Sequence, residues 1–251
     1  MNIIIRMPNW IGDLVMATPI LADVRTKFPS ASITAMCQRP LSDLLTKDPS
    51  INEIFCFTKP ANGFLRRDDL RDIISKIAVG KYDIGILLTN SFSSAWWFWN
   101  GGVKRRIGSA KSFRSWLLTD PVKIPQKGEE HEVISYKRLL EPLGIPISST
   151  APRLFFAPSE VKISKQLLFQ RGYIEGRPLV GINVGASYGS AKCWPPDKFR
   201  ALAVDLLCEK NISIDLAEER KGVTEALGNK TSRTALGVIL DKSLSLPIRG
   251  M

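Results

Sequence analysis

Short apolar runs alternate with amphipathic stretches through residues 1–143, and this alternation predicts an α/β fold. The first run, Ile3-Ile4-Ile5 within Asn2–Arg6, is β-branched throughout and predicts a strand buried on both faces. The pattern predicts further strands at Ser32–Met36, Glu53–Phe57, Tyr82–Leu88 and Val103–Ile107, and helices at Leu41–Leu45, Asp68–Val79, Asn90–Trp99 and Glu132–Leu143. Such alternation favours a parallel, doubly wound sheet with right-handed crossovers.

A helix is expected soon after the first strand, because apolar residues recur three or four positions apart from Leu14 to Phe28. Pro19 lies inside this stretch, so we expect a kink or a restart near Thr18. The segment Asn9–Asp13 joins the strand to the helix and carries both a glycine and an aspartate. This segment is the first crossover of the predicted sheet.

Asp13 follows the carboxyl end of the first predicted strand, which is where open α/β sheets bind their ligands. A carboxylate at that place can act as a general base on a hydroxyl group. The structural alternative is a helix N-cap, a position that Asp fills often. Spacing alone leaves both interpretations open.

The second half of the chain begins with residues 144–158, which are rich in Pro and Ser and predict a linker between domains. Beyond it the pattern predicts a helix at Ser159–Gln170, a strand at Leu179–Val184, a helix at Pro196–Lys210 and a strand at Ile212–Leu216. From about Ala217 the sequence becomes irregular. We therefore expect a complete domain over 1–143 and a truncated α/β domain over 159–251, with a site in the cleft between them.

The segment Gly185–Pro196 joins a predicted strand to a predicted helix and contains small residues and Lys192. Backbone N–H groups at a helix start favour an anion, and Lys192 adds a positive charge, so the segment predicts a phosphate-binding loop. It matches neither the Walker A pattern nor G-x-G-x-x-G. A surface turn with a solvated lysine is the alternative.

The composition is basic, with 35 Lys and Arg against 24 Asp and Glu and a net charge of +11. This balance indicates an anionic partner or simply a soluble surface. The run Lys104-Arg105-Arg106, with Lys111 and Arg114 beyond it, is expected near the carboxyl edge of the sheet as a clamp for phosphate or carboxylate groups. A solvated charged face is the alternative.

Several classes of protein are disfavoured by residues that the sequence lacks. Its four cysteines, Cys37, Cys56, Cys193 and Cys208, form no C-x-x-C pair, which disfavours a zinc cluster and favours reduced thiols. His131 is the only histidine and no Asp-x-Asp pair occurs, so a catalytic triad or a metal-dependent sugar-nucleotide enzyme is not expected. The sequence shows neither a signal peptide nor an apolar stretch of membrane-spanning length.

Three stretches together resemble the lipopolysaccharide heptosyltransferases, family 9 of the GT-B glycosyltransferases. Arg6–Pro19 reads Arg-Met-Pro-Asn-Trp-Ile-Gly-Asp-Leu-Val-Met-Ala-Thr-Pro and is similar to the opening of that family, above all in its Asn-Trp-Ile-Gly-Asp core. Ala191–Pro195, Ala-Lys-Cys-Trp-Pro, is similar to the family's Ala-Lys-x-Trp-Pro loop. Arg106–Gly108, followed by Arg114 and Leu117-Leu118, resembles its Arg-x-Gly segment.

The resemblance covers roughly residues 1–216 and implies a GT-B fold and an inverting transfer of heptose from ADP-heptose to the inner core of lipopolysaccharide, without a metal or cofactor. By this resemblance Asp13 is the general base, and Lys192, beside Ser187 and Tyr188, stabilises the departing diphosphate. The residues that would face the anionic lipid A–core acceptor are Lys104, Arg105, Arg106 and Arg114. The resemblance also implies a cytoplasmic enzyme peripheral to the anionic inner membrane, with no nucleic-acid partner.

The sequence departs from the family after about Leu216, because the family's nucleotide-binding Asp-Ser-Gly-x-x-His motif does not occur. Gly228–Ser232 matches the family's Gly-Lys-Thr-Ser only in part. We therefore expect a second domain that is truncated or altered in reading frame, with an impaired donor site. Two alternative functions are a non-catalytic remnant that binds anionic glycolipid and a nucleotide-dependent oxidoreductase, which the missing G-x-G-x-x-G disfavours.

Overall fold

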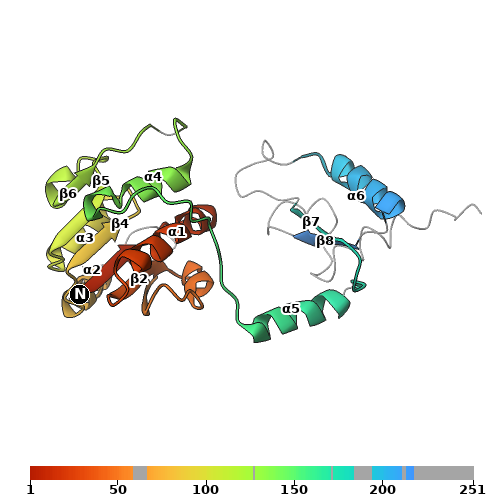
Figure 1. The fold of residues 1–251 in the computed structure, drawn as a ribbon, viewed down its shortest axis with the longest axis horizontal. Coiled ribbons are helices and arrows are strands. Elements are labelled where there is room, and N and C mark those ends of the chain that lie inside the picture. Colours follow the sequence, from red (N-terminus) through yellow and green to blue (C-terminus); the bar gives the residue numbers. More distant parts are fainter. Residues whose placement is uncertain (59–66, 127, 171, 184–193, 211–212, 218–251) are drawn as a thin grey trace, which may run out of the picture. The chain divides into compact units, whose positions relative to one another are not determined.

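The structure is a computed structural model, and it describes residues 1–58, 67–126, 128–170, 172–183, 194–210 and 213–217. The chain divides into two compact units, Met1–Ala157 and Pro158–Met251 (Figure 1). Among the described helices, none has both the length and the apolar composition needed to cross a bilayer.

The first unit is built on a parallel sheet in the order β3-β2-β1-β4-β5-β6. Its strands are β1 (Asn2–Arg6), β2 (Ser32–Gln38), β3 (Glu53–Phe57), β4 (Ile84–Leu87), β5 (Arg105–Ser109) and β6 (Asp120–Val122). Its helices are α1 (Ile11–Lys27), α2 (Arg67–Val79), α3 (Phe92–Asn100) and α4 (Glu132–Arg138), with 3₁₀ turns η1 (Leu41–Leu45), η2 (Ser115–Leu117) and η3 (Glu141–Leu143). The predicted parallel, doubly wound sheet is confirmed, and the strand order reverses between β1 and β4.

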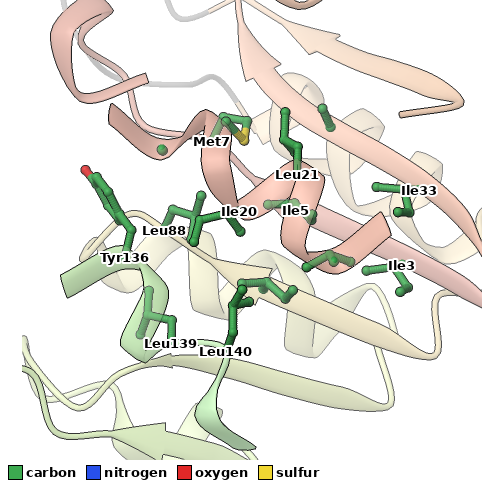
Figure 2. Packing of buried hydrophobic residues seen from close by; sticks show 14 of the residues in the cluster. Ile3, Ile5, Met7, Ile20, Leu21, Ile33, Leu88, Tyr136, Leu139 and Leu140 are labelled. Atoms are coloured by element: carbon green, nitrogen blue, oxygen red, sulfur yellow. The ribbon is translucent and has the colours of Figure 1, made fainter. Parts of the chain in front are cut away.

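Both faces of the sheet are buried, as the apolar strand pattern predicts. Ile3 and Ile5 point into one hydrophobic cluster and Ile4 into the other, because successive side chains of a strand alternate between faces. Helices α1 and α4 pack together over the first cluster, where Leu21 and Leu140 contribute (Figure 2). Residues of α2 and α3 line the second cluster.

Helix α1 runs unbroken from Ile11 to Lys27, so the restart expected near Thr18 is wrong. Pro19 has no N–H to donate to the carbonyl oxygen of Val15, four residues earlier. The Thr18 hydroxyl donates a hydrogen bond of 2.8 Å to that same oxygen. The carbonyl is therefore satisfied, and the helix continues through the proline.

Two other predictions differ from the structure in the region after β5. The single helix expected over Glu132–Leu143 is divided into α4 and η3, because Pro142 has no N–H for the carbonyl of Arg138. The chain still ends this helical stretch at Gly144, which adopts a left-handed φ of 66°. Strand β6 was not predicted, since its three residues include Pro121 and are too few to show a period.

Part of the predicted linker 144–158 is fixed to the first unit by buried polar side chains. Ser148 and Thr150 each donate a hydrogen bond of 2.7 Å to the carboxylate of Asp23 on α1. The ammonium of Lys137, which is 2% exposed, donates to the carbonyl oxygens of the same two residues. This part of the segment therefore belongs to the fold of the first unit.

The second unit contains α5 (Pro158–Gln170), β7 (Leu179–Asn183), α6 (Pro196–Lys210) and β8 (Ser213–Ala217). Strands β7 and β8 pair in parallel, and Ile182 and Ala203 are buried between β7 and α6. The predicted order of strand, helix and strand is confirmed for the part of this unit that the structure describes.

Alkaline pH is expected to destabilise the protein, because burial in the first unit favours the neutral form of three acidic groups. Burial raises the pKa of Cys37 from 9.0 to about 11 and also raises the pKa of Tyr82 and Tyr136. The folded state thus keeps protons that the unfolded state loses, so stability that is fully present below pH 9.0 is lost as the pH rises from 9.0 through about 11. A difference of one pKa unit between the folded and unfolded states changes the free energy of unfolding by about 1.4 kcal/mol.

The measurement is the midpoint of thermal unfolding at increasing pH up to about 10. Burial lowers the pKa of Arg6 to about 10, so above that pH the folded state loses a proton that the unfolded state keeps, and this raises stability with pH. We expect the midpoint to fall across this range. A Cys37→Val variant removes one of the three groups and should show a shallower fall. A midpoint that stays constant would show that these groups do not titrate differently in the two states.

Candidate active site at the carboxyl edge of the sheet

Polar side chains gather where β1, β4 and β5 end. Arg6 ends β1, Thr89 and Asn90 follow β4, and Ser109 ends β5. Since neighbouring strands are parallel, these residues meet at one edge of the sheet, next to the point where the strand order reverses. Ligands of open α/β sheets bind at such a point.

Arg6 fixes the path of the chain between β1 and α1. Its side chain is 2% exposed, and its guanidinium donates to the carbonyl oxygen of Met7 and, at 2.5 Å, to the amide oxygen of Asn9. The guanidinium also lies over the ring of Phe57, 4.7 Å from its centroid. Arg6 therefore holds the turn that leads into Asp13.

Asp13 is not the N-cap of α1, so the structural alternative for this residue is wrong. Trp10 is the cap residue, with extended backbone and no side-chain cap hydrogen bond, and the first helical bond runs from the N–H of Leu14 to its carbonyl oxygen. Asp13 lies in the first turn instead and is half-buried. The helix dipole favours a negative charge there.

Tyr136 of α4 lies beside the start of α1 and was not predicted as part of the site. Burial is the main cause that raises the pKa of its phenol, and the negative charge of Asp13 is the next. The phenol of Tyr136 points out of the apolar cluster shared by α1 and α4 (Figure 2). The site thus combines a carboxylate with a neutral phenol near it.

Arg114 joins the ends of β4 and β5 from below the surface. Its guanidinium donates to the carbonyl oxygens of Thr89, Ser91 and Ser109 at 2.6, 3.1 and 3.2 Å, and to the Ser109 hydroxyl at 3.3 Å. Burial lowers its pKa to about 10. The side chain is 0% exposed, so in this structure Arg114 positions these loops, and its acceptor contact stays a prediction.

The basic run does not lie at this edge, so its predicted placement is wrong. Arg105 and Arg106 begin β5, and Lys104 precedes it, which places all three at the amino edge of the sheet. A strand of five residues separates the two edges by about 13–17 Å. The structure therefore does not bring Lys104, Arg105 or Arg106 together with Asp13.

Each member of the basic run makes contacts within the chain. The ammonium of Lys104 bonds the carboxylate of Asp83 at 2.8 Å, and Arg105 forms two bonds with the carboxylate of Asp120 at 2.8 and 3.1 Å. Arg106 donates to the carbonyl oxygen of Leu117 at 2.7 Å. These contacts tie the starts of strands together, and an acceptor contact remains only a prediction for these three residues.

The predicted donor-binding residues Ser187, Tyr188 and Lys192 lie outside the described residues. The elements on either side of them are described: β7 ends at Asn183 and α6 begins at Pro196. The predicted strand–loop–helix frame is therefore present.

Sequence reasoning missed Arg6 and Asn9 as a pair, although a basic residue that ends an apolar strand is a visible signal. It also missed two buried polar atoms at this edge. Among the described residues, Arg6 Nε and Thr89 Oγ1 are buried without a hydrogen-bond partner within the protein. Such atoms are uncommon in folded proteins, so each calls for an explanation.

Comparison with known proteins gives a consistent result. The family model for glycosyltransferase family 9 (heptosyltransferase) matches residues 70–234. Lipooligosaccharide heptosyltransferase 2 of Haemophilus ducreyi is 28% identical over 226 residues, which cover 88% of this chain and 64% of that protein. The chain thus spans about 64% of the length of this relative.

Solved structures show the same likeness. E. coli ADP-heptose lps heptosyltransferase II is 25% identical with a TM-score of 0.69, over 86% of this chain and 64% of that one. A glycosyl transferase of family 9 from Veillonella parvula is 17% identical with a TM-score of 0.79, over 96% of this chain and 66% of that one, and shows the shared fold.

Proposed function

The chain belongs to glycosyltransferase family 9, the heptosyltransferases, and from this membership we propose that it transfers heptose from ADP-heptose to the inner core of lipopolysaccharide. The observation that carries the proposal is Asp13, a half-buried carboxylate at the carboxyl edge of the sheet that does not serve as the helix cap. The names of the similar proteins, heptosyltransferase 2 and ADP-heptose lps heptosyltransferase II, supply the substrates of the proposal.

In the proposed reaction Asp13 accepts the proton of an acceptor hydroxyl. The freed oxygen forms a bond to the anomeric carbon of the heptose on the face opposite ADP, while the bond between that carbon and the diphosphate oxygen breaks. The configuration at the anomeric carbon is therefore inverted, and ADP departs with the bonding electrons. A positioned base of this kind contributes about 10²–10⁴-fold to a rate.

Gly12 supports an acceptor site beside Asp13. A β carbon at this position would meet no protein atom within 4 Å, and Gly12 is not in the left-handed region. Gly12 is the second residue of α1, and neither packing nor a left-handed backbone requires a glycine there. The close approach of a ligand to the helix backbone would explain the glycine.

Lys192 is proposed to stabilise the negative charge on the departing diphosphate, with Ser187 and Tyr188 beside it. Support comes from the family match, which includes these residues, and from the frame of β7 and α6 around them. The start of α6, a helix of 15 residues, favours an anion through its dipole. The site is proposed to act at the cytoplasmic face of the inner membrane.

Titration with ADP tests the donor site, and release of ADP from ADP-heptose in the presence of a lipid A–core acceptor tests the transfer. The Lys192→Ala variant is expected to bind ADP at least about ten-fold more weakly, because a hydrogen bond to a charged group contributes about 1.5–3 kcal/mol. Lys165→Ala, on the exposed surface of α5, is the matched control and should bind as the parent does.

Two results would contradict the proposal in different ways. Failure to bind ADP at millimolar concentration would favour the non-catalytic remnant that holds glycolipid. ADP binding that is equal in the parent and Lys192→Ala would keep a nucleotide site but remove Lys192 from it.

A further inference from the structure

Four exposed aromatic side chains of the first unit lie on α3 or in the segment that follows β5. They are Phe92 and Trp99 of α3, Phe113 in the loop after β5, and Trp116 of η2. Their exposed fractions are 44%, 48%, 97% and 67%. We refer to these four residues as the aromatic surface.

Three of the rings form a continuous group. The ring of Trp116 lies 6.0 Å from that of Phe92 and 6.4 Å from that of Trp99, measured between centroids. Phe92 and Trp99 are seven positions apart on α3 and therefore share one side of that helix. The opposite side of α3 packs into the core, where Trp97 and Phe98 are buried. The exposed rings are thus additional to the packing that holds α3.

Phe113 is presented to solvent by a backbone that the protein constrains. Ser112 and Phe113 have φ values of 63° and 52°. Residues other than glycine rarely adopt this left-handed backbone conformation. The next residue, Arg114, is fully buried and bonded to the ends of β4 and β5. The buried arginine therefore anchors a strained turn whose neighbouring ring points outward, and such strain is found mainly at functional positions.

The stretch of sequence that carries the aromatic surface is strongly basic. Residues 90–128 contain seven Lys and Arg and one acidic residue, Asp120, which pairs with Arg105. Lys111 and Lys123 are both exposed, and the hydrogen bond from Ala110 N–H to the Val122 carbonyl brings their segments together. Over half of the net charge of +11 thus comes from this stretch.

We propose that the aromatic surface, with Lys111 and Lys123 at its margin, docks the protein onto an anionic phospholipid bilayer. Aromatic rings settle at the level of the lipid headgroups, and basic side chains beside them are attracted to anionic lipid. The inference rests on the proposed function, which acts at the inner membrane, and deepens it by naming the surface that meets the bilayer. It stands on exposure, ring contacts and charge.

Charge favours a bilayer over a second copy of the chain. A symmetric dimer through this surface would bring the same patch of each copy together, and Lys111 and Lys123 of one copy would face those of the other. Like charges at such a contact repel each other. An anionic bilayer instead offers apolar depth for the rings and negative charge for the lysines.

Sedimentation with phosphatidylethanolamine vesicles, with and without phosphatidylglycerol, tests the proposal. The parent protein should bind the vesicles that contain phosphatidylglycerol, and the double variant Phe113→Ser with Trp116→Ser should lose about ten-fold or more of this binding. Phe156→Ser is the matched control, because Phe156 is 63% exposed but lies outside the aromatic surface. Unchanged binding by the double variant would overturn the proposal.

A second pair of variants tests the charge without altering the rings. Lys111→Glu with Lys123→Glu should abolish the preference for phosphatidylglycerol, and binding by the parent should weaken as salt is added. The control is Lys47→Glu, an exposed lysine just after η1, which packs beside β2 and β3 at the other side of the sheet. Binding that changes neither with phosphatidylglycerol nor with replacement of the two lysines would contradict an anionic partner.

The outcomes also separate this proposal from the proposed function. Turnover of a water-soluble acceptor fragment should be unchanged in the double aromatic variant, whereas transfer to an acceptor embedded in vesicles should slow. A parent protein that binds vesicles without any transfer would refute the function and keep the docking surface. A parent that sediments as a dimer in solution, and a double variant that does not, would assign the surface to self-association instead.

Discussion

Replacement of Asp13 by asparagine is expected to lower the rate of heptose transfer by about 10²–10⁴-fold while leaving the fold intact. Asparagine keeps the size and shape of the side chain but cannot accept the proton of an acceptor hydroxyl. The measurement is ADP release at saturating ADP-heptose and acceptor. ADP affinity should stay at the parent value, because the proposed donor site is built from other residues.

The structure explains why stability should change little in this variant. Asp13 is half-buried in the first turn of α1, and the cap position belongs to Trp10. The loss of a negative charge near the helix start costs about 0.3–1 kcal/mol. A fall in rate with a nearly constant unfolding midpoint would therefore point to chemistry and not to misfolding.

Asp68→Asn is the matched control for this experiment. Asp68 also lies in the first turn of a helix that follows a strand of the same sheet, but α2 follows the edge strand β3 and Asp68 is well exposed. This variant should turn over as the parent does. Full activity of Asp13→Asn would remove Asp13 from the mechanism, and equal losses in both variants would indicate a general electrostatic effect.

The sequence pattern was sufficient to predict the fold class and the place of Asp13. A short run of β-branched apolar residues such as that in Asn2–Arg6 predicts a buried strand. The alternation of such strands with helices favours a parallel sheet. Likeness to solved structures of the family confirms the GT-B fold class, and the chain covers 64% and 66% of the length of the two compared.

The position of the basic run could have been predicted but was not. Lys104, Arg105 and Arg106 stand at the start of the strand expected at Val103–Ile107, and the start of a parallel strand lies at the amino edge. Their charge carries no information about the edge, whereas their place at the start of the strand does. Successive residues of β5 also point to opposite faces, so Arg105 and Arg106 bond different neighbours.

The role of Arg114 could not be read from the sequence. Arginine is almost never fully buried, so a position in a polar loop beside Phe113 predicts an exposed side chain. Only the folded structure shows three carbonyl oxygens converging on one guanidinium. Loop carbonyls carry no sequence signal, because every residue has one.

Replacement of Arg114 by methionine is expected to destabilise the first unit by about 3–5 kcal/mol. The guanidinium is 0% exposed and satisfies the carbonyl oxygens of Thr89, Ser91 and Ser109. Methionine fills a similar volume but donates nothing, so these buried oxygens lose their partner, at about 1–3 kcal/mol for each that water cannot reach. The midpoint of thermal unfolding should fall by roughly 10 °C for a domain of this size.

Arg114→Lys separates the charge from the geometry of the guanidinium. Lysine keeps the positive charge, but its single ammonium cannot reach oxygens that lie on both the β4 and the β5 loops, so most of the stability should still be lost. Lys111→Met removes an exposed charge three residues away and should leave the unfolding midpoint nearly unchanged. If Arg114→Met unfolds at the parent temperature but loses binding of the anionic acceptor, Arg114 contacts the acceptor after all, through an opening of the β5 loop. If the variant unfolds early and Arg114→Lys does not recover it, the residue serves to hold the ends of β4 and β5 at the edge where Asp13 is proposed to act.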